Sequence, residues 1–122
     1  MLPLFNKEAL QRACRREDLI RETADQIIKD FSEFGLDVVF SGEVVDFYQD
    51  LFFQLKVHVT QLVERNYTRF LSLLYRIDIS DNEIVAYEKE YPDLSYSEVL
   101  SILIIHRELK KVLTRDFFRS KK

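Results

Sequence analysis

The chain has 122 residues, of which 47% are hydrophobic and 32% are charged, and its formal net charge is −3. This composition is too apolar for a disordered chain, and the small excess of acid gives no general attraction to nucleic acid. Two glycines and two prolines are too few for a strand-rich fold with many turns. The length predicts a single helical domain, residues 1–122, with one core.

The N-terminal sequence lacks an apolar run of signal-peptide length, and no apolar run approaches the roughly 18 residues of a membrane-spanning helix. The cytoplasm is therefore the expected location, and no contact with a membrane is predicted. The chain has one cysteine, Cys14, which cannot form a disulfide within the chain.

Residues 5–34 form the first predicted helical region, because apolar side chains recur there at steps of three and four. A dense run of charges around Arg16 leaves open whether this region is one helix or two. Gly35 is the predicted stop, since glycine readily adopts the left-handed conformation that ends many helices. The connector 35–42 is expected to be an extended segment packed on the helices, because a lone strand would have no partner.

The stretch Glu43–Asp78 is the predicted central helix, around which the other helices pack, and Ser41 is its predicted cap. The stretch contains neither proline nor glycine to interrupt it. Its apolar side chains cover more than the stripe that a surface helix needs. A second apolar row lies outside the main stripe and is a candidate interface. This row consists of Phe53, Val57, Leu71 and Tyr75.

Two serines mark the starts of the remaining helices. Ser80 followed by Glu83 has the spacing of a capping box, in which each side chain bonds a backbone N–H at the helix start. Ser95 followed by Glu98 repeats this spacing. The first of these helices should be short and end near Tyr91, before a proline, and the last should run over residues 96–118. The predicted fold is an all-α bundle of three long helices and one short helix.

Neither histidine has the sequence context of a metal site. Di-iron bundles use Glu-x-x-His, but Leu55 precedes His58 by three residues and Leu103 precedes His106. Both histidines are predicted to be hydrogen-bonded residues in or beside the core. One cysteine and two histidines are too few for a structural zinc site, and no glycine-rich phosphate loop is present. No catalytic, cofactor-binding or metal-binding residue is therefore predicted, and no enzyme activity.

Charge is unevenly distributed along the chain. Acids dominate residues 78–98 and bases dominate residues 107–122. The helix dipole accounts for much of this pattern, because it favours acids at N-termini and bases at C-termini. The alternative is a basic surface that contacts nucleic acid, to which Arg65, Arg69 and Arg76 would add an edge. The candidate basic surface at the C-terminal end consists of Arg107, Lys110, Lys111, Arg115 and Arg119.

Residues 66–79 read NYTRFLSLLYRIDI. This segment resembles one in small uncharacterised all-helical bacterial proteins, in which a long helix ending in Leu-Tyr-Arg-Ile-Asp precedes a capped short helix. The resemblance covers this segment alone, and it implies no activity, cofactor or functional residue.

The predicted function is a non-enzymatic module that binds another protein or itself, and a nucleic-acid-associated helical module is the alternative. A straight helix from residue 44 to residue 77 would span about 51 Å. A compact domain of this size has a diameter of roughly 35 Å, so the helix would project from a monomer. We therefore predict a homodimer that covers the second apolar row, with no cofactor and no small-molecule substrate.

Overall fold

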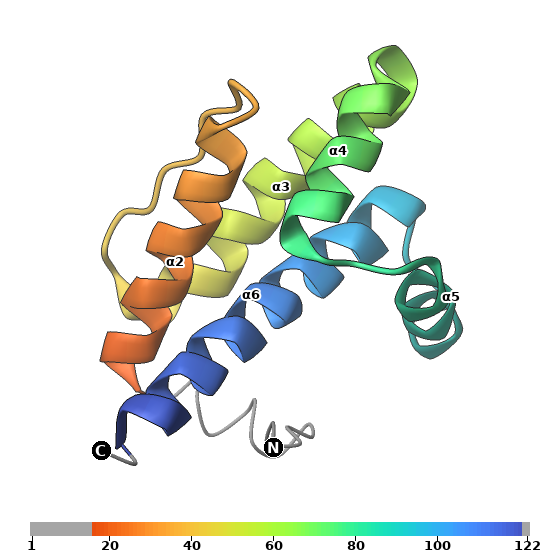
Figure 1. Cartoon of the computed structure of the whole chain (residues 1–122). Coiled ribbons are helices and arrows are strands. Elements are labelled where there is room, and N and C mark those ends of the chain that lie inside the picture. Colours follow the sequence, from red (N-terminus) through yellow and green to blue (C-terminus); the bar gives the residue numbers. More distant parts are fainter. Residues whose placement is uncertain (1–15, 121–122) are drawn as a thin grey trace.

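The computed structural model describes residues 16–120, drawn as the coloured ribbon in Figure 1. These residues form five α-helices and one short 3-10 helix, and none of them lies in a strand. The elements are α2 (Glu17–Ser32), η1 (Val44–Asp46), α3 (Phe47–Arg65), α4 (Tyr67–Ile77), α5 (Asp81–Glu90) and α6 (Tyr96–Ser120). The prediction of an all-α fold is confirmed, but the predicted number of helices, three long and one short, is wrong.

Helix α6 is the element that the other helices share. It crosses the molecule diagonally in Figure 1 and contacts α2, α3, α4 and α5. Every residue from Val99 to Ile105 is buried, because this run is apolar on all sides of the helix apart from Ser101. The Ser101 hydroxyl donates a hydrogen bond of 2.7 Å to the Ser97 carbonyl. The stretch Glu43–Asp78 is therefore not the central element that the sequence predicts.

The predicted helix Glu43–Asp78 is divided at Asn66 into α3 and α4. The Asn66 backbone leaves helical geometry (φ −151°, ψ 72°), and its side chain accepts a hydrogen bond of 3.2 Å from the Arg69 backbone N–H. Asparagine favours such a cap because its side chain replaces a missing helical acceptor. The absence of proline and glycine was thus not enough to keep the helix continuous. Because α4 turns back against α3, the straight rod of about 51 Å does not exist.

The start of α3 also differs from the prediction. The Ser41 hydroxyl does not cap a helix, because it accepts a hydrogen bond of 3.2 Å from the nearby Glu43 N–H. The short helix η1 follows, and α3 begins only at Phe47, after Asp46, whose side chain makes no capping hydrogen bond. The 3-10 turn therefore delays the start of the regular helix.

Helix α2 is shorter than the predicted region 5–34. The Arg16 backbone is extended (φ −100°, ψ 112°), so the helix begins at Glu17 and does not run through this residue. Gly35 has a φ of 71°, and its N–H donates a hydrogen bond of 3.0 Å to the Ser32 carbonyl, which confirms the predicted glycine stop. Cys14 and the earlier part of the region lie outside the described residues.

The connector between α2 and α3 is extended, as expected. A glutamine side chain on α3 takes the place of a neighbouring strand: Gln54 Nε2 donates to the Val39 carbonyl at 2.7 Å, and Gln54 Oε1 accepts from the Val39 N–H at 2.9 Å. Val38 is buried, and the Phe40 ring packs edge-on against Phe47. Side-chain amides thus satisfy backbone groups that would otherwise need a sheet.

Helices α5 and α6 begin where the sequence predicts. The Glu83 N–H donates to Ser80 Oγ at 3.3 Å, and the Ser80 N–H donates to Glu83 Oε1 at 3.1 Å. Ser95 and Glu98 make the same two bonds at 3.2 Å and 2.9 Å. Both capping boxes are confirmed, because they depend only on residues three positions apart.

Candidate interaction surface

The second apolar row of the sequence is exposed in the structure. Phe53 is 70% exposed and Tyr75 is 89% exposed, and Val57 and Leu71 are also exposed. The break at Asn66 leaves Phe53 and Val57 on α3 and Leu71 and Tyr75 on α4, so the row is not continuous along one helix. Each helix therefore presents its own apolar surface.

Four exposed side chains of α3 follow one another at steps of four residues. We call this line the outer ridge of α3, and it consists of Gln49, Phe53, Val57 and Gln61, all of them exposed. Val45 in η1 continues the spacing at one end and is 91% exposed, and the exposed Arg65 continues it at the other end. No member of the ridge is charged, although 32% of the chain is charged. Sequence reasoning identified the two apolar members and missed the glutamines, although the spacing of four was visible in the sequence.

A second line of exposed apolar side chains runs along α4 at the same spacing. It consists of Tyr67, Leu71 and Tyr75. The other side of α4 faces the core, where Phe70, Leu73, Leu74 and Ile77 are buried. Arg76 leaves this helix toward α2 and pairs with acids there, so the outer line itself carries no charge.

The candidate basic surface of α6 is largely used in contacts within the chain. Arg107 pairs with Asp78 at 2.7 Å, and Lys111 pairs with Glu108 at 3.1 Å. Arg119 pairs with Glu22 at 3.0 Å.

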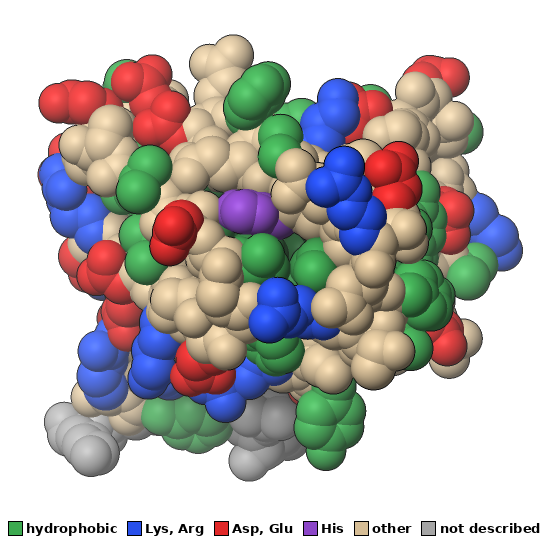
Figure 2. Space-filling view, turned by 90° about the horizontal axis from the view of Figure 1, so that it is seen from above, with side chains coloured by type: hydrophobic (Ala, Val, Ile, Leu, Met, Phe, Trp, Pro, Cys, Tyr) green, Lys and Arg blue, Asp and Glu red, His purple; other side chains and the backbone are tan. Residues whose placement is uncertain are grey.

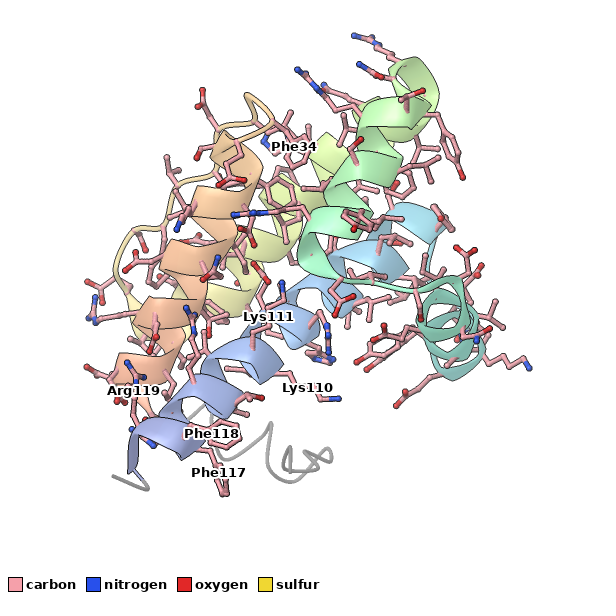
Figure 3. All side chains as sticks on the ribbon, viewed as in Figure 1. Phe34, Lys110, Lys111, Phe117, Phe118 and Arg119 are labelled. Carbon is pink, nitrogen blue, oxygen red and sulfur yellow. The ribbon has the colours of Figure 1, made fainter. Side chains whose placement is uncertain are left out.

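The remaining two basic residues of this surface differ. Arg115 lies 3.8 Å from Glu22 and also donates a hydrogen bond of 3.1 Å to Gln26, whereas Lys110 makes no ion pair within residues 16–120. On the face that Figure 2 shows, Lys and Arg side chains alternate with acidic ones and form no single basic patch. In Figure 3, Arg119 lies on the side of α2 and Lys110 projects away from it. These side chains mainly attach α6 to its neighbours.

Both histidines are hydrogen-bonded beside the core, as predicted. The His58 ring lies against Phe31, with 6.0 Å between ring centroids, and its Nε2 is 2.7 Å from the Asp37 carbonyl oxygen. Because a carbonyl only accepts, Nε2 carries the proton and donates. His58 therefore fixes the connector to α3.

His106 connects three helices through two tyrosines. Its Nε2 lies 3.1 Å from the Tyr48 hydroxyl on α3, and its Nδ1 lies 3.0 Å from the Tyr87 hydroxyl on α5. In a neutral imidazole one nitrogen donates and the other accepts, so one tyrosine accepts and the other donates. Burial raises the pKa of the Tyr87 hydroxyl to about 12, which keeps it protonated and available as a donor. The cluster holds α5 on the bundle.

Two buried carboxyl side chains are the feature that sequence reasoning missed. Asp30 on α2 is 1% exposed and Glu108 on α6 is 0% exposed. The signal was present for Glu108, which stands four residues after Ile104 and four before Val112, on the buried stripe of its helix. Acids at such positions are usually assigned to the surface, and the sequence alone does not show that two of them meet.

Within residues 16–120, no three side chains of the metal-binding types come together, and no helix is long and apolar enough to cross a membrane. Residues 66–79 form the Asn66 cap, α4 and the two residues that follow it, Asp78 and Ile79. No family model, curated protein or solved structure matches the chain.

Proposed function

We propose that this chain is a non-enzymatic protein-interaction module that pairs with a second copy of itself through the outer ridge of α3. The observation that carries this proposal is the exposed, uncharged ridge Gln49, Phe53, Val57 and Gln61. The proposal places the protein in the cytoplasm, where its single cysteine needs no disulfide partner.

Exposure of the ridge supports a docking role because its apolar members are adjacent. Isolated apolar side chains are common on protein surfaces, whereas contiguous ones tend to mark interaction sites. Phe53 and Val57 lie one helical turn apart, so their side chains form one surface. Charged residues are depleted at the centres of interfaces, and aromatic residues are enriched there.

Charge on and around the ridge favours a protein partner over nucleic acid. Most of the affinity for nucleic acid comes from Lys and Arg side chains that neutralise phosphates, and none of the four ridge residues is basic. Of the two basic residues nearest it, Lys56 is already paired with Glu98 at 3.5 Å, and Arg65 lies at the C-terminal end of the line. Most of the basic side chains of α6 are likewise paired within the chain.

The order of residues along the ridge favours a second copy as the partner. In an antiparallel pair of α3 helices with a two-fold axis midway between Phe53 and Val57, Phe53 of each copy faces Val57 of the other. The same axis sets Gln49 opposite Gln61, so that amides meet amides and apolar side chains meet apolar ones. The ridge is thus self-complementary, and its lack of charge removes repulsion between identical surfaces.

We expect this pairing to be reversible. A stable interface usually buries about 800 Å² on each partner, and the contact between two single helices is smaller. Ridges with a spacing of four residues pack against each other at an angle of about 50°, which further limits the length of the contact. The dissociation constant of the dimer should therefore lie in the micromolar range.

Sedimentation of the protein across micromolar concentrations tests the proposal. We expect the parent to dimerise, Phe53→Glu to weaken dimerisation at least about tenfold, because it places a charge in a dry contact, and Val85→Glu to leave it unchanged. Val85 is a matched control, because it is an exposed apolar residue of α5. A parent that is monomeric throughout contradicts the proposal, and so does a dimer that Phe53→Glu leaves intact. Leu71→Glu tests whether the line on α4 takes part.

A pair of double variants tests the orientation of the two helices. Gln49→Lys with Gln61→Lys places like charges opposite each other in any pairing of the ridges, so it should weaken the dimer. Gln49→Lys with Gln61→Glu places opposite charges together only in the antiparallel pair, so it should keep the dimer. Equal weakening by both double variants would contradict the antiparallel arrangement.

A further inference from the structure

The buried carboxyl groups of Asp30 and Glu108 meet at the seam between α2 and α6. Asp30 is 1% exposed and Glu108 is 0% exposed, and their side chains lie within hydrogen-bonding reach of each other. Two carboxylates in contact repel each other, and each loses its hydration on burial. The contact therefore needs a compensating group.

The neighbouring donors satisfy only one of the four carboxyl oxygens. Asp30 Oδ1 accepts hydrogen bonds from Gln26 Nε2 at 3.1 Å and from Arg76 Nε at 3.4 Å. Arg115 holds the Gln26 amide in this orientation, because it donates to Gln26 Oε1 at 3.1 Å. Asp30 Oδ2 and both oxygens of Glu108 have no hydrogen-bond partner among the described residues.

Lys111 does not remove this deficit. Its Nζ lies 3.1 Å from Glu108 Oε1, which is an ion-pair distance, but Glu108 Oε2 and Asp30 Oδ2 stay without a partner. The Lys111 side chain is also partly exposed, so water screens its charge.

The charges around the seam do not balance when every acid is ionised. Asp30, Glu33 and Glu108 are the acids of this cluster, and Arg76 and Lys111 are its bases. Arg76 is shared between Asp30 and Glu33, to which it donates at 2.9 Å. One negative charge is left over in this cluster; Glu33, which carries part of it, is exposed, whereas the carboxyl oxygens that lack a hydrogen-bond partner are buried.

We propose that Asp30 and Glu108 form a proton-binding site, in which the folded protein holds one proton on Glu108 and shares it with Asp30 Oδ2. A single proton gives Glu108 a donor, gives Asp30 Oδ2 a partner, and neutralises the excess charge. The proton belongs on Glu108 because Asp30 already accepts from Arg76 and Gln26. The site joins α2 to α6 and, through Arg76, to α4.

Burial raises the pKa of Glu108 from 4.5 to about 8, the Asp30 carboxylate adds to the rise, and Lys111 opposes it. Because the pKa of Glu108 is higher in the folded protein than its ordinary value of 4.5, its contribution to stability is fully present below pH 4.5. This contribution declines as the pH rises and is lost above about pH 8, with the folding equilibrium constant changing by up to about tenfold per pH unit. The packing of α2 on α6 is thereby linked to proton concentration near neutrality.

Carbon-13 NMR of the full chain, labelled at glutamate carboxyls, tests the site directly. We expect one glutamate carboxyl to be protonated at about pH 6.5, where ordinary glutamates are ionised, and to titrate near pH 8. Its signal should be absent from Glu108→Gln and present in Glu88→Gln, an exposed control on α5. A parent in which every glutamate is ionised at this pH overturns the proposal, whether or not the variant folds.

Chemical denaturation from about pH 5 to about pH 9 supplies a second readout. Glutamine resembles the protonated acid and does not titrate, so the stability of Glu108→Gln should gain on the parent as the pH rises toward 8. Glu88→Gln should follow the parent. Parallel profiles of Glu108→Gln and the parent would overturn the proposal.

Discussion

The α2–α6 seam and the outer ridge of α3 distribute polar and apolar groups in opposite ways. At the seam, the carboxyl groups of Asp30 and Glu108 are enclosed by helices. On the ridge, the side chains of Phe53 and Val57 face outward. A typical surface helix exposes its carboxyl groups and buries its apolar side chains.

The difference lies in where each region finds its partners. The seam contains cations, an amide and a shared proton, so its polar groups are balanced within one chain. The ridge has no counterpart among the described residues, although its sequence order fits a second copy of itself. The seam therefore satisfies its polar groups within one chain, whereas the ridge would be covered only in the proposed dimer.

Truncation of a core phenylalanine should have the largest effect. Phe31 on α2 is fully buried, and Phe31→Ala would remove its contacts and leave a cavity. We expect a loss of about 3–5 kcal/mol in the free energy of unfolding. Urea denaturation at neutral pH measures this loss, and a change below about 1 kcal/mol would mean that the α2 side of the core is loosely packed.

Loss of a helix cap, away from both regions, should have an intermediate effect. Ser80→Ala removes the hydroxyl that accepts from the Glu83 N–H at the start of α5. The expected cost is about 0.5–2 kcal/mol in thermal or chemical unfolding. Ser80→Asp keeps a capping oxygen and serves as the control. Equal stability of the alanine variant and the parent would show that the capping box contributes nothing.

Truncation of the ridge phenylalanine should have the smallest effect on folding. Phe53 makes few contacts in the monomer because it is 70% exposed. At dilutions where the dimer dissociates, Phe53→Ala should change the free energy of unfolding by no more than about 0.5 kcal/mol. A loss as large as that of Phe31→Ala would show that Phe53 supports the fold, and the comparison of the two regions would fail.

Local signals in the sequence predicted the parts of the fold that depend on a few neighbouring residues. The two capping boxes and the glycine stop involve residues three to five positions apart, and the structure contains all three. Asn66 is an equally local signal, but the prediction of a continuous helix rested on the absence of proline and glycine alone. Asparagine ends a helix through its side chain, not through backbone restriction, so that absence does not exclude a break.

Features that depend on tertiary contact were harder to predict. Both the stretch Glu43–Asp78 and α6 are apolar on several sides, and only the packing decides which is enclosed. The second apolar row was identified from helical spacing, and its exposure agrees with a candidate interface. The contact between Asp30 and Glu108 joins positions far apart in the chain, so no spacing in the sequence announces it.

Amide NMR spectra recorded over a dilution series would locate the interface between two copies residue by residue. We expect concentration-dependent shifts to be concentrated in residues 49–61, which contain the outer ridge of α3, while the signals of α5 stay constant. Spectra that do not change with concentration, or shifts confined to other helices, would contradict the claim that this ridge binds a second copy of the chain.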